Sequence, residues 1–391
     1  MSRPISSRVK SLEPFLAMEV MERAFEMERE GEHVLHLEIG EPDFDPPRAA
    51  VAACVRALEQ GETHYTDSRG LAELREAIAS DTRRRFGAEV SADRVLVANG
   101  TSTAMLLVFS LLLEPGDEVV LGTPWYPCYP NFIRYCGGRI VPVPLDPTGG
   151  YQLDPDAVRR ALTPRTRAIV VNSPANPTGA IQSRETMAGL AELGIPLVSD
   201  EIYDGIVYDG ARVTSALEVS EDAFVLDGFS KRYAMTGFRL GYVIAPAWAL
   251  RPLQIMHQNL FLSANRFVQH AGVAALEHGA ESLSRALPVY ARRRQLLVDG
   301  LRALGLRIPE LPRGAFYVLA DASPLGARCT DSRWLAFEIL ERARVGVTPG
   351  VDFGAAGEGK LRFCYAVSEE TIAQALDRLR DALPAIVGRP S

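Results

Sequence analysis

The chain lacks the features that mark several large classes of protein. It has no run of about 18 apolar residues that could span a bilayer, and its first residues contain no apolar signal core. The six histidines form no metal-ligand pattern, and the five cysteines fit neither a zinc site nor a CxxC redox motif. With 49 acidic against 42 basic residues, the net charge is −7, which is unlike a nucleic-acid-binding protein. We therefore expect a cytoplasmic protein that binds neither membrane, metal nor nucleic acid.

Two common nucleotide-binding loops are also missing. The sequence contains no GxxxxGK[ST] loop of the kind that P-loop NTPases use. It also has no GxGxxG after a first strand, which a nicotinamide-dependent dehydrogenase would carry. What is present is an ordinary globular composition, with 47% hydrophobic and 23% charged residues. At 391 residues the chain is long enough for two domains.

Short apolar segments alternate with helical patterns along the first half of the chain. Strands are predicted at 95–98, 118–121, 139–143, 168–171 and 196–199. Helices are predicted between them at 103–113, 129–136, 155–161 and 184–193. This alternation predicts an α/β fold whose mostly parallel sheet is covered by helices on both faces. Ligands bind to such sheets at the carboxyl ends of the strands.

The pattern changes after about residue 248. A long helix is predicted at 277–304, followed by short strands at 315–319, 346–348 and 360–365 and a last helix at 369–383. These elements indicate a smaller α+β domain. A helix at 15–30 and a strand at 33–39 are expected to join it, because that strand has no other sheet nearby. The predicted divisions are 1–47 for the N-terminal segment, 48–285 for the large domain and 286–391 for the small domain.

The segment Ser230–Tyr242 holds one lysine between two predicted buried strands. An amine held away from bulk water has a lowered pKa, and Lys231 would then be a nucleophile toward carbonyls. Ser230 and Arg239 suit an anion, most simply a phosphate. The alternative is that Lys231 is an ordinary solvated lysine.

Polar residues follow two other predicted strands. Gly100, Thr101 and Ser102 come after the first strand, and backbone N–H groups at a helix start can bind an anion. Asn176 lies in the proline-rich turn Asn172–Gly179, which would hold its amide rigidly. An ordinary helix cap and a plain loop are the alternatives for these two segments.

Asp200 and Tyr203 follow the strand at 196–199. A carboxylate at the end of a buried strand is costly unless it is paired with a cation, and no arginine lies close in sequence. A cationic cofactor nitrogen would serve, although Asp200 could instead cap a helix. Together these segments offer an amine, a carboxylate, a hydroxyl, an amide and a phosphate cradle. This set specifies pyridoxal phosphate, which needs a lysine Schiff base and a carboxylate on its ring nitrogen.

With these residues the chain resembles the fold-type I, class I and II aminotransferases that use pyridoxal phosphate, the aspartate aminotransferase-like superfamily. The resemblance extends from Ser7 to about Leu383. The matching motifs are Gly40–Phe44, Tyr65 with Gly70–Arg75, Asn172–Gly179, Ser199–Tyr203, Ser230–Tyr242, Pro312–Tyr317, and Thr348–Gly350 with Arg362. So many motifs in one order exclude a chance match.

The resemblance implies a role for each matching residue. Lys231 is the Schiff-base and proton-shuttle residue, Asp200 pairs with the ring nitrogen, and Tyr203 and Asn176 bond the ring oxygen. Tyr126 stacks on the ring, in preference to its neighbour Trp125. The phosphate is held by Gly100, Thr101, Ser102, Ser230 and Arg239.

The resemblance also implies substrate and subunit contacts. Arg362 binds the substrate α-carboxylate with help from Gly40 and Asn176. Tyr65 reaches the phosphate of the other subunit, which implies a homodimer. Cis peptide bonds are expected at Thr123–Pro124 and Asn176–Pro177.

The activity implied is transfer of an amino group from an L-amino acid to a 2-oxo acid by a ping-pong mechanism. A carbon–sulfur β-lyase on the same fold is the alternative. The residues before Gly40 leave no room for the DNA-binding domain of an aminotransferase-like regulator. Phe15 and Leu16 would cover the pocket and favour an apolar or neutral side chain, and Ser102 puts simple aspartate specificity in doubt. Arg266 could instead receive an acidic side chain across the dimer, or be a structural arginine.

Overall fold

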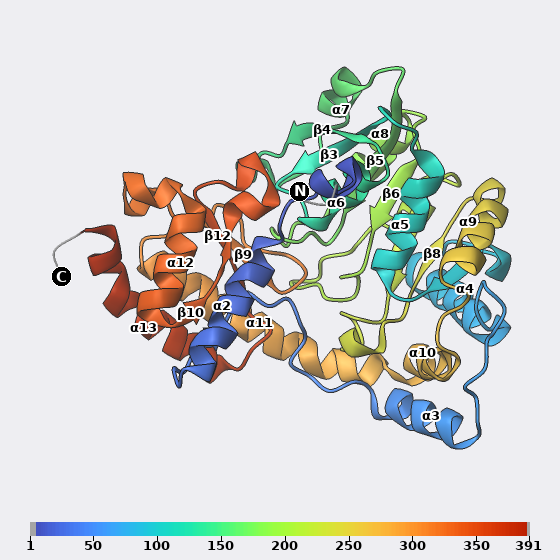
Figure 1. Cartoon of the computed structure of the whole chain (residues 1–391), viewed down its shortest axis with the longest axis horizontal. Helices are drawn as coiled ribbons and strands as arrows, with labels where there is room; N and C mark the ends of the chain where they lie inside the picture. Colours follow the sequence, from blue (N-terminus) through green and yellow to red (C-terminus); the bar gives the residue numbers. More distant parts are fainter. Residues whose placement is uncertain (1–4, 389–391) are drawn as a thin grey trace.

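A computed structural model describes residues 5–388 and shows one large sheet beside a smaller one (Figure 1). The large sheet has seven strands in the order β2-β8-β7-β6-β5-β3-β4. All neighbours are parallel except β8, which is antiparallel to both β2 and β7. The strands are β2 (Val95–Ala98), β3 (Glu118–Thr123), β4 (Arg139–Pro144), β5 (Thr166–Asn172), β6 (Leu197–Asp200), β7 (Phe224–Gly228) and β8 (Gly241–Ile244). The α/β class expected from the sequence is confirmed.

Helices cover both faces of this sheet. Successive strand residues alternate between two buried clusters, so that Val97 packs on one face and Leu96 on the other. Because both faces are buried, the strands read as continuous apolar runs. One face packs against α3 (Arg48–Glu59), α4 (Ala72–Phe86), α7 (Pro155–Ala161), α8 (Arg184–Ala191) and α10 (Arg266–His278). The other packs against α5 (Thr101–Leu112), α6 (Cys128–Tyr135) and α9 (Ala247–Leu260).

The smaller unit has a three-stranded antiparallel sheet of order β11-β12-β9. Its elements are β9 (Tyr317–Asp321), α12 (Ser332–Ala343), β10 (Val345–Gly346), β11 (Thr348–Pro349), β12 (Lys360–Cys364) and α13 (Glu369–Val387). The N-terminal α2 (Leu16–Arg29), preceded by the short α1 (Ser7–Lys10), lies against this unit in Figure 1. After it, β1 (Leu35–His36) pairs in parallel with β10.

Three predicted elements differ in the structure. The strand expected at 33–39 is only the two-residue β1, because β10, with which it pairs, is itself two residues long. The single helix expected at 277–304 is the end of α10 followed by α11 (Ala280–Ala303), with a break at Gly279. A Cβ at Gly279 would lie 2.6 Å from the ring of Tyr233, so a side chain there has no room. The strand expected at 346–348 is divided between β10 and β11, which belong to different sheets.

The domain bounds expected from the sequence remain a prediction, and their ends at residues 1–4 and 389–391 lie outside the described residues. Both expected cis bonds are present, with a third at Ser173–Pro174. Within residues 5–388, no helix is both long and apolar enough to cross a membrane.

Candidate active site

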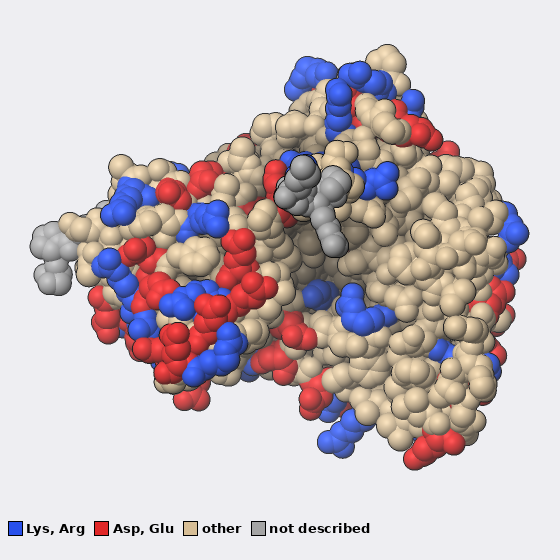
Figure 2. Space-filling model, viewed as in Figure 1, with Lys and Arg blue, Asp and Glu red and all other residues tan. Residues whose placement is uncertain are grey.

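A cavity of about 260 Å³ lies where the carboxyl ends of the large-sheet strands face the smaller unit. Figure 2 shows the molecule hollowed between these two parts. The cavity brings together predicted site residues from widely separated segments of the chain: Gly40, Thr101, Ser102, Tyr126, Asn176, Asp200, Tyr203, Ser230, Lys231, Arg239 and Arg362. Parallel strands explain the gathering, because their carboxyl ends share one edge of the sheet.

Lys231 lies in the loop that follows β7. Its Nζ donates a hydrogen bond to the backbone oxygen of Gly40 at 2.6 Å. Burial lowers the pKa of Lys231 to about 8, because the charged amine loses its hydration. A substantial fraction of the amine is therefore neutral, and hence nucleophilic, at mildly alkaline pH.

Arg239 and the start of α5 form one end of the cavity. Gly100 precedes α5 with a φ of 87°, and a Cβ on it would lie 2.8 Å from Nη2 of Arg239. Glycine thus allows the guanidinium to approach the helix N-terminus. Nη1 of Arg239 donates to the backbone oxygen of Thr236 at 2.9 Å. The free N–H groups of the first turn and the guanidinium together suit a bound anion.

Asp200 ends β6 and is buried. Its Oδ2 accepts a hydrogen bond from the hydroxyl of Tyr129 at 2.7 Å, and its Oδ1 accepts one from the backbone N–H of Ile202 at 3.3 Å. Burial raises the pKa of Asp200 to about 6, and the two hydrogen bonds oppose that rise. The charge of Lys231 also lowers this pKa, but the carboxylate forms no ion pair among the described residues, so the site favours a positively charged ligand atom.

Arg362, on β12, is only 2% exposed. Its Nη1 donates to Oδ1 of Asn176 at 3.1 Å, and its Nη2 donates to Oγ1 of Thr348 at 2.9 Å and to the backbone oxygen of Glu38. Its guanidinium carbon lies 4.6 Å from the ring centre of Tyr317. Within residues 5–388 it has no carboxylate partner, and its Nε has no hydrogen-bond acceptor. A buried guanidinium in this state is a site for an anion.

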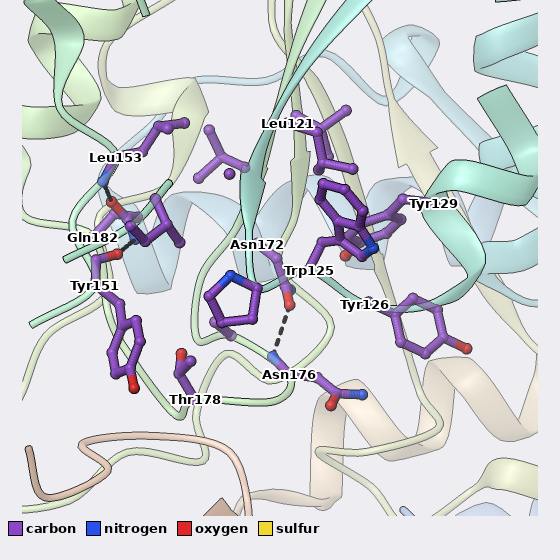
Figure 3. A pocket seen from close by; sticks show the side chains of 16 residues that line it. Leu121, Trp125, Tyr126, Tyr129, Tyr151, Leu153, Asn172, Asn176, Thr178 and Gln182 are labelled. Carbon is purple, nitrogen blue, oxygen red and sulfur yellow. Dashed lines mark hydrogen bonds between the residues drawn. The ribbon is translucent and has the colours of Figure 1, made fainter. Parts of the chain in front are cut away.

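A second, smaller cavity lies beside the first, under the turn that carries Asn176 (Figure 3). The backbone N–H of Asn176 donates to Oδ1 of Asn172 at 2.8 Å, and the Asn172 amide donates to the backbone oxygen of Asp200. These bonds hold the turn against the end of β6. Tyr126 borders both cavities, whereas its neighbour Trp125 borders only the smaller of the two.

The family model "Aminotransferase class I and II" matches residues 32–379. The chain belongs to the class I and II aminotransferases. The aspartate/prephenate aminotransferase of Thermus thermophilus is 40% identical over 97% of this chain and 99% of its own. The (5-formylfuran-3-yl)methyl phosphate transaminase of Methanocaldococcus jannaschii is 37% identical over 97% and 99%.

Solved structures of aminotransferases are also similar to this chain. The Thermus thermophilus aspartate aminotransferase with maleate has a TM-score of 0.92 at 39% identity, covering 97% of this chain and 100% of that one. A Methanococcus jannaschii structure, described as similar in its active site to kynurenine aminotransferases, has a TM-score of 0.89 at 37% identity and the same coverage. This chain is therefore an aminotransferase with the fold of these enzymes, and the carbon–sulfur lyase alternative is not favoured.

Of the remaining residues singled out from the aminotransferase sequence, Phe15 lines the main cavity and the others lie outside it. Tyr65 is 76% exposed. Arg266 forms an ion pair with Glu62 and does not line the cavity. Phe15 lines it, 6.2 Å from the ring of Tyr126, but Leu16 borders a different cavity beside α6. Gly100 does not line the cavity, but it lies next to the guanidinium of Arg239, which does.

Sequence reasoning did not single out several residues that complete the aminotransferase site. Tyr129, in the first turn of α6, comes three residues after Tyr126, which precedes the helix, and the two rings pack edge to edge with centroids 5.3 Å apart. Tyr317 shares a 2.8 Å hydrogen bond with Tyr203 and ends a motif that was already noted. Glu38 contributes through its backbone oxygen, for which the sequence carries no signal.

Proposed function

We propose that this aminotransferase uses pyridoxal phosphate held by Lys231. The observation that carries the proposal is the distribution of charge around one cavity. Among residues 5–388, Lys231, Arg239 and Arg362 face it without an ion-paired carboxylate, and Asp200 faces it without an ion-paired cation. These are the groups that a ligand with an aldehyde, a phosphate and a basic ring nitrogen would satisfy.

When bound, pyridoxal phosphate supplies an electrophilic carbonyl carbon and a ring that accepts electrons. We propose that Lys231 bonds that carbon and later moves protons at its Nζ. Asp200 keeps a proton on the ring nitrogen, and Tyr203 and Asn176 hydrogen-bond the ring oxygen. Tyr126 stacks on the ring. The phosphate binds to Gly100, Thr101, Ser102, Ser230 and Arg239.

Arg362 is the proposed site for the substrate α-carboxylate. Its contacts with Asn176 and Thr348 fix the guanidinium plane, so it can bind a carboxylate with two parallel hydrogen bonds. Gly40 and Asn176 contribute from the neighbouring segments. Both half-reactions of a ping-pong transfer use this anchor, because the amino acid and the oxo acid carry the same carboxylate.

We further propose that the enzyme is a homodimer in which Tyr65 contacts the phosphate of the partner's site. Exposed apolar residues on the elements beside its loop support this, since the loop follows α3 and Thr66 donates a hydrogen bond to Ser263 after α9: Val51, Val55, Leu58, Leu260 and Leu262 are 41–62% exposed. Figure 2 also shows that the surface over the large sheet carries fewer charged side chains than the surface over the smaller unit. Light scattering on the purified protein tests the dimer, and a monomer at micromolar concentration would contradict it. The cytoplasmic location stays a prediction.

Replacement of Lys231 by alanine tests the proposed function. The native protein should keep a visible cofactor absorbance through dialysis, and one equivalent of amino acid should convert it in a reaction that then stops. Lys231→Ala should lose the covalently held absorbance and the transfer activity together. If Lys231→Ala kept full transfer activity, Lys231 would not be the residue that bonds the cofactor and the proposed function would be wrong. Continuous release of oxo acid and ammonia from an amino acid alone would instead indicate a lyase.

A further inference from the structure

The main cavity has an apolar wall in addition to its charged groups. Three of the chain's eight methionines line it: Met18 and Met21 from α2, and Met105 from α5. Phe15 and Ile39 extend the same wall. None of these five side chains has a part in the proposed binding of the cofactor or the α-carboxylate.

Contacts on the other faces of α2 hold the methionines toward the cavity. Val20, Ala24 and Met27 are buried against the smaller unit. At the start of the helix, the Asp352 carboxylate accepts hydrogen bonds from the backbone N–H groups of Leu16 and Ala17 at 3.0 and 3.2 Å.

Two ion pairs add to this attachment. Arg23 pairs with Glu341 at 2.7 Å, and Glu19 pairs with Arg333 at 3.1 Å. These contacts outside the cavity fix the rotation of α2 about its own axis. Met18 and Met21, one turn apart, therefore face into the cavity.

Every cation that lines the cavity already has a proposed partner. Lys231, Arg239 and Arg362 are the lining residues of basic type among residues 5–388. Arg266, the further candidate for an acidic side chain, is paired with Glu62 outside the lining. A substrate with a second carboxylate would have to place it against thioethers and a phenyl ring, which costs free energy without a compensating charge.

We propose that Met18, Met21 and Met105, with Phe15 and Ile39, form the side-chain subsite, and that the amino donor carries an uncharged, apolar side chain. The inference rests on the proposed function, since it takes the three cations as occupied by cofactor and α-carboxylate. Methionine is flexible and polarisable, so the wall can adapt to aromatic and to long aliphatic or thioether side chains. The names of the relatives do not fix this property, because one names aspartate and prephenate and another, a Pseudomonas aeruginosa transaminase 35% identical to this chain, names arginine and pyruvate.

The test uses the holoenzyme and a panel of amino acids, with the bound cofactor's absorbance as the signal. Half-reaction rates are measured for phenylalanine, leucine, methionine, aspartate and glutamate. The native enzyme should favour the apolar donors by about tenfold or more over the two acidic ones. Met18→Arg adds a cation at a position that is 42% exposed and so tolerates it. That variant should move the glutamate-to-phenylalanine ratio by roughly fivefold toward glutamate.

Met18→Gln is the matched control, because it adds polarity at similar length without charge, and its ratio should change little. Retained cofactor absorbance shows that each variant is folded, and Met21→Arg repeats the measurement if Met18→Arg does not fold. An acidic donor that is fastest with the native enzyme would overturn the inference and leave the proposed function standing. If the glutamate-to-phenylalanine ratio stayed unchanged in both Met18→Arg and Met21→Arg, the proposed side-chain subsite would be wrong. Absence of a spectral change with every donor would overturn the proposed function and the inference with it.

Discussion

Tyr129 donates its hydroxyl proton to Oδ2 of Asp200 at 2.7 Å, and both side chains are buried. The bond lowers the pKa of Asp200 against the rise that burial causes. Tyr129 therefore helps to keep an ionised carboxylate where water is excluded. In the proposed function this ionised form is the one that holds the cofactor's ring nitrogen.

Tyr129→Phe is expected to weaken cofactor binding, and more at pH 6 than at pH 8. A hydrogen bond to a charged group contributes about 1.5–3 kcal/mol, so the loss corresponds to about tenfold or more in affinity. The effect grows at pH 6 because the pKa of Asp200 rises further without the bond. Titration of the apoenzyme with pyridoxal phosphate at both pH values measures it. Tyr126→Phe is the control, and equal affinities for the native enzyme and Tyr129→Phe would refute the role.

The depressed pKa of Lys231 predicts a pH-dependent cost to the stability of the apoenzyme. The folded-state pKa of about 8 lies below the unfolded value of 10.5, so the unfolded chain binds more protons between these two pH values. The cost is full below about pH 8 and disappears as the pH rises toward 10.5. Lys231→Met should therefore be more stable than the native apoenzyme at pH 7, by up to about 3 kcal/mol. Urea unfolding at pH 7 and pH 10 measures the difference, and a gain that persisted at pH 10 would argue against this origin.

Arg362→Leu is expected to lose donor binding while keeping the cofactor. Loss of one partner from a buried charged contact costs about 2–5 kcal/mol, so kcat/KM should fall at least about 30-fold. Stopped-flow measurements of the half-reaction with one good amino donor give kcat/KM for the native enzyme and the variant. Thr348→Val removes one of the guanidinium's hydrogen bonds and should have a smaller effect in the same direction. Unchanged donor affinity in Arg362→Leu would place the carboxylate elsewhere.

A buried ionic cluster beneath the site predicts a large stability effect at Arg85. Its guanidinium pairs with Asp81, Asp204 and Asp227 at 2.9, 2.5 and 2.9 Å, and so ties α4 to the segment after β6 and to β7 itself. Arg85→Met should lower the free energy of unfolding by about 3–5 kcal/mol, because buried carboxylates lose their partner. Arg83, on the same helix but 65% exposed, is the control, and Arg83→Met should change it by less than about 0.5 kcal/mol. Equal effects of the two variants in urea unfolding would contradict this account.

The sequence was most informative where local pattern and parallel topology agree. Residues placed at predicted strand ends, such as Asp200 and Lys231, do line one cavity, because parallel strands end at a common edge. The sequence was least informative about contacts that tertiary packing alone creates. The hydroxyl of Tyr129, the backbone oxygen of Glu38 and the break at Gly279 depend on neighbours remote in the chain.

The course of the N-terminal segment has a practical consequence for recombinant production. Glu13 exchanges two hydrogen bonds with Asn131 on α6, and two residues later Phe15 lines the cavity. An affinity tag fused before this segment therefore sits close to residues that contact the proposed substrate. Helix α13 ends at Val387 on the outer side of the smaller unit (Figure 1). Preparations intended for kinetics are better tagged after that helix, and donor preferences measured with an uncleaved N-terminal tag need a tag-free comparison.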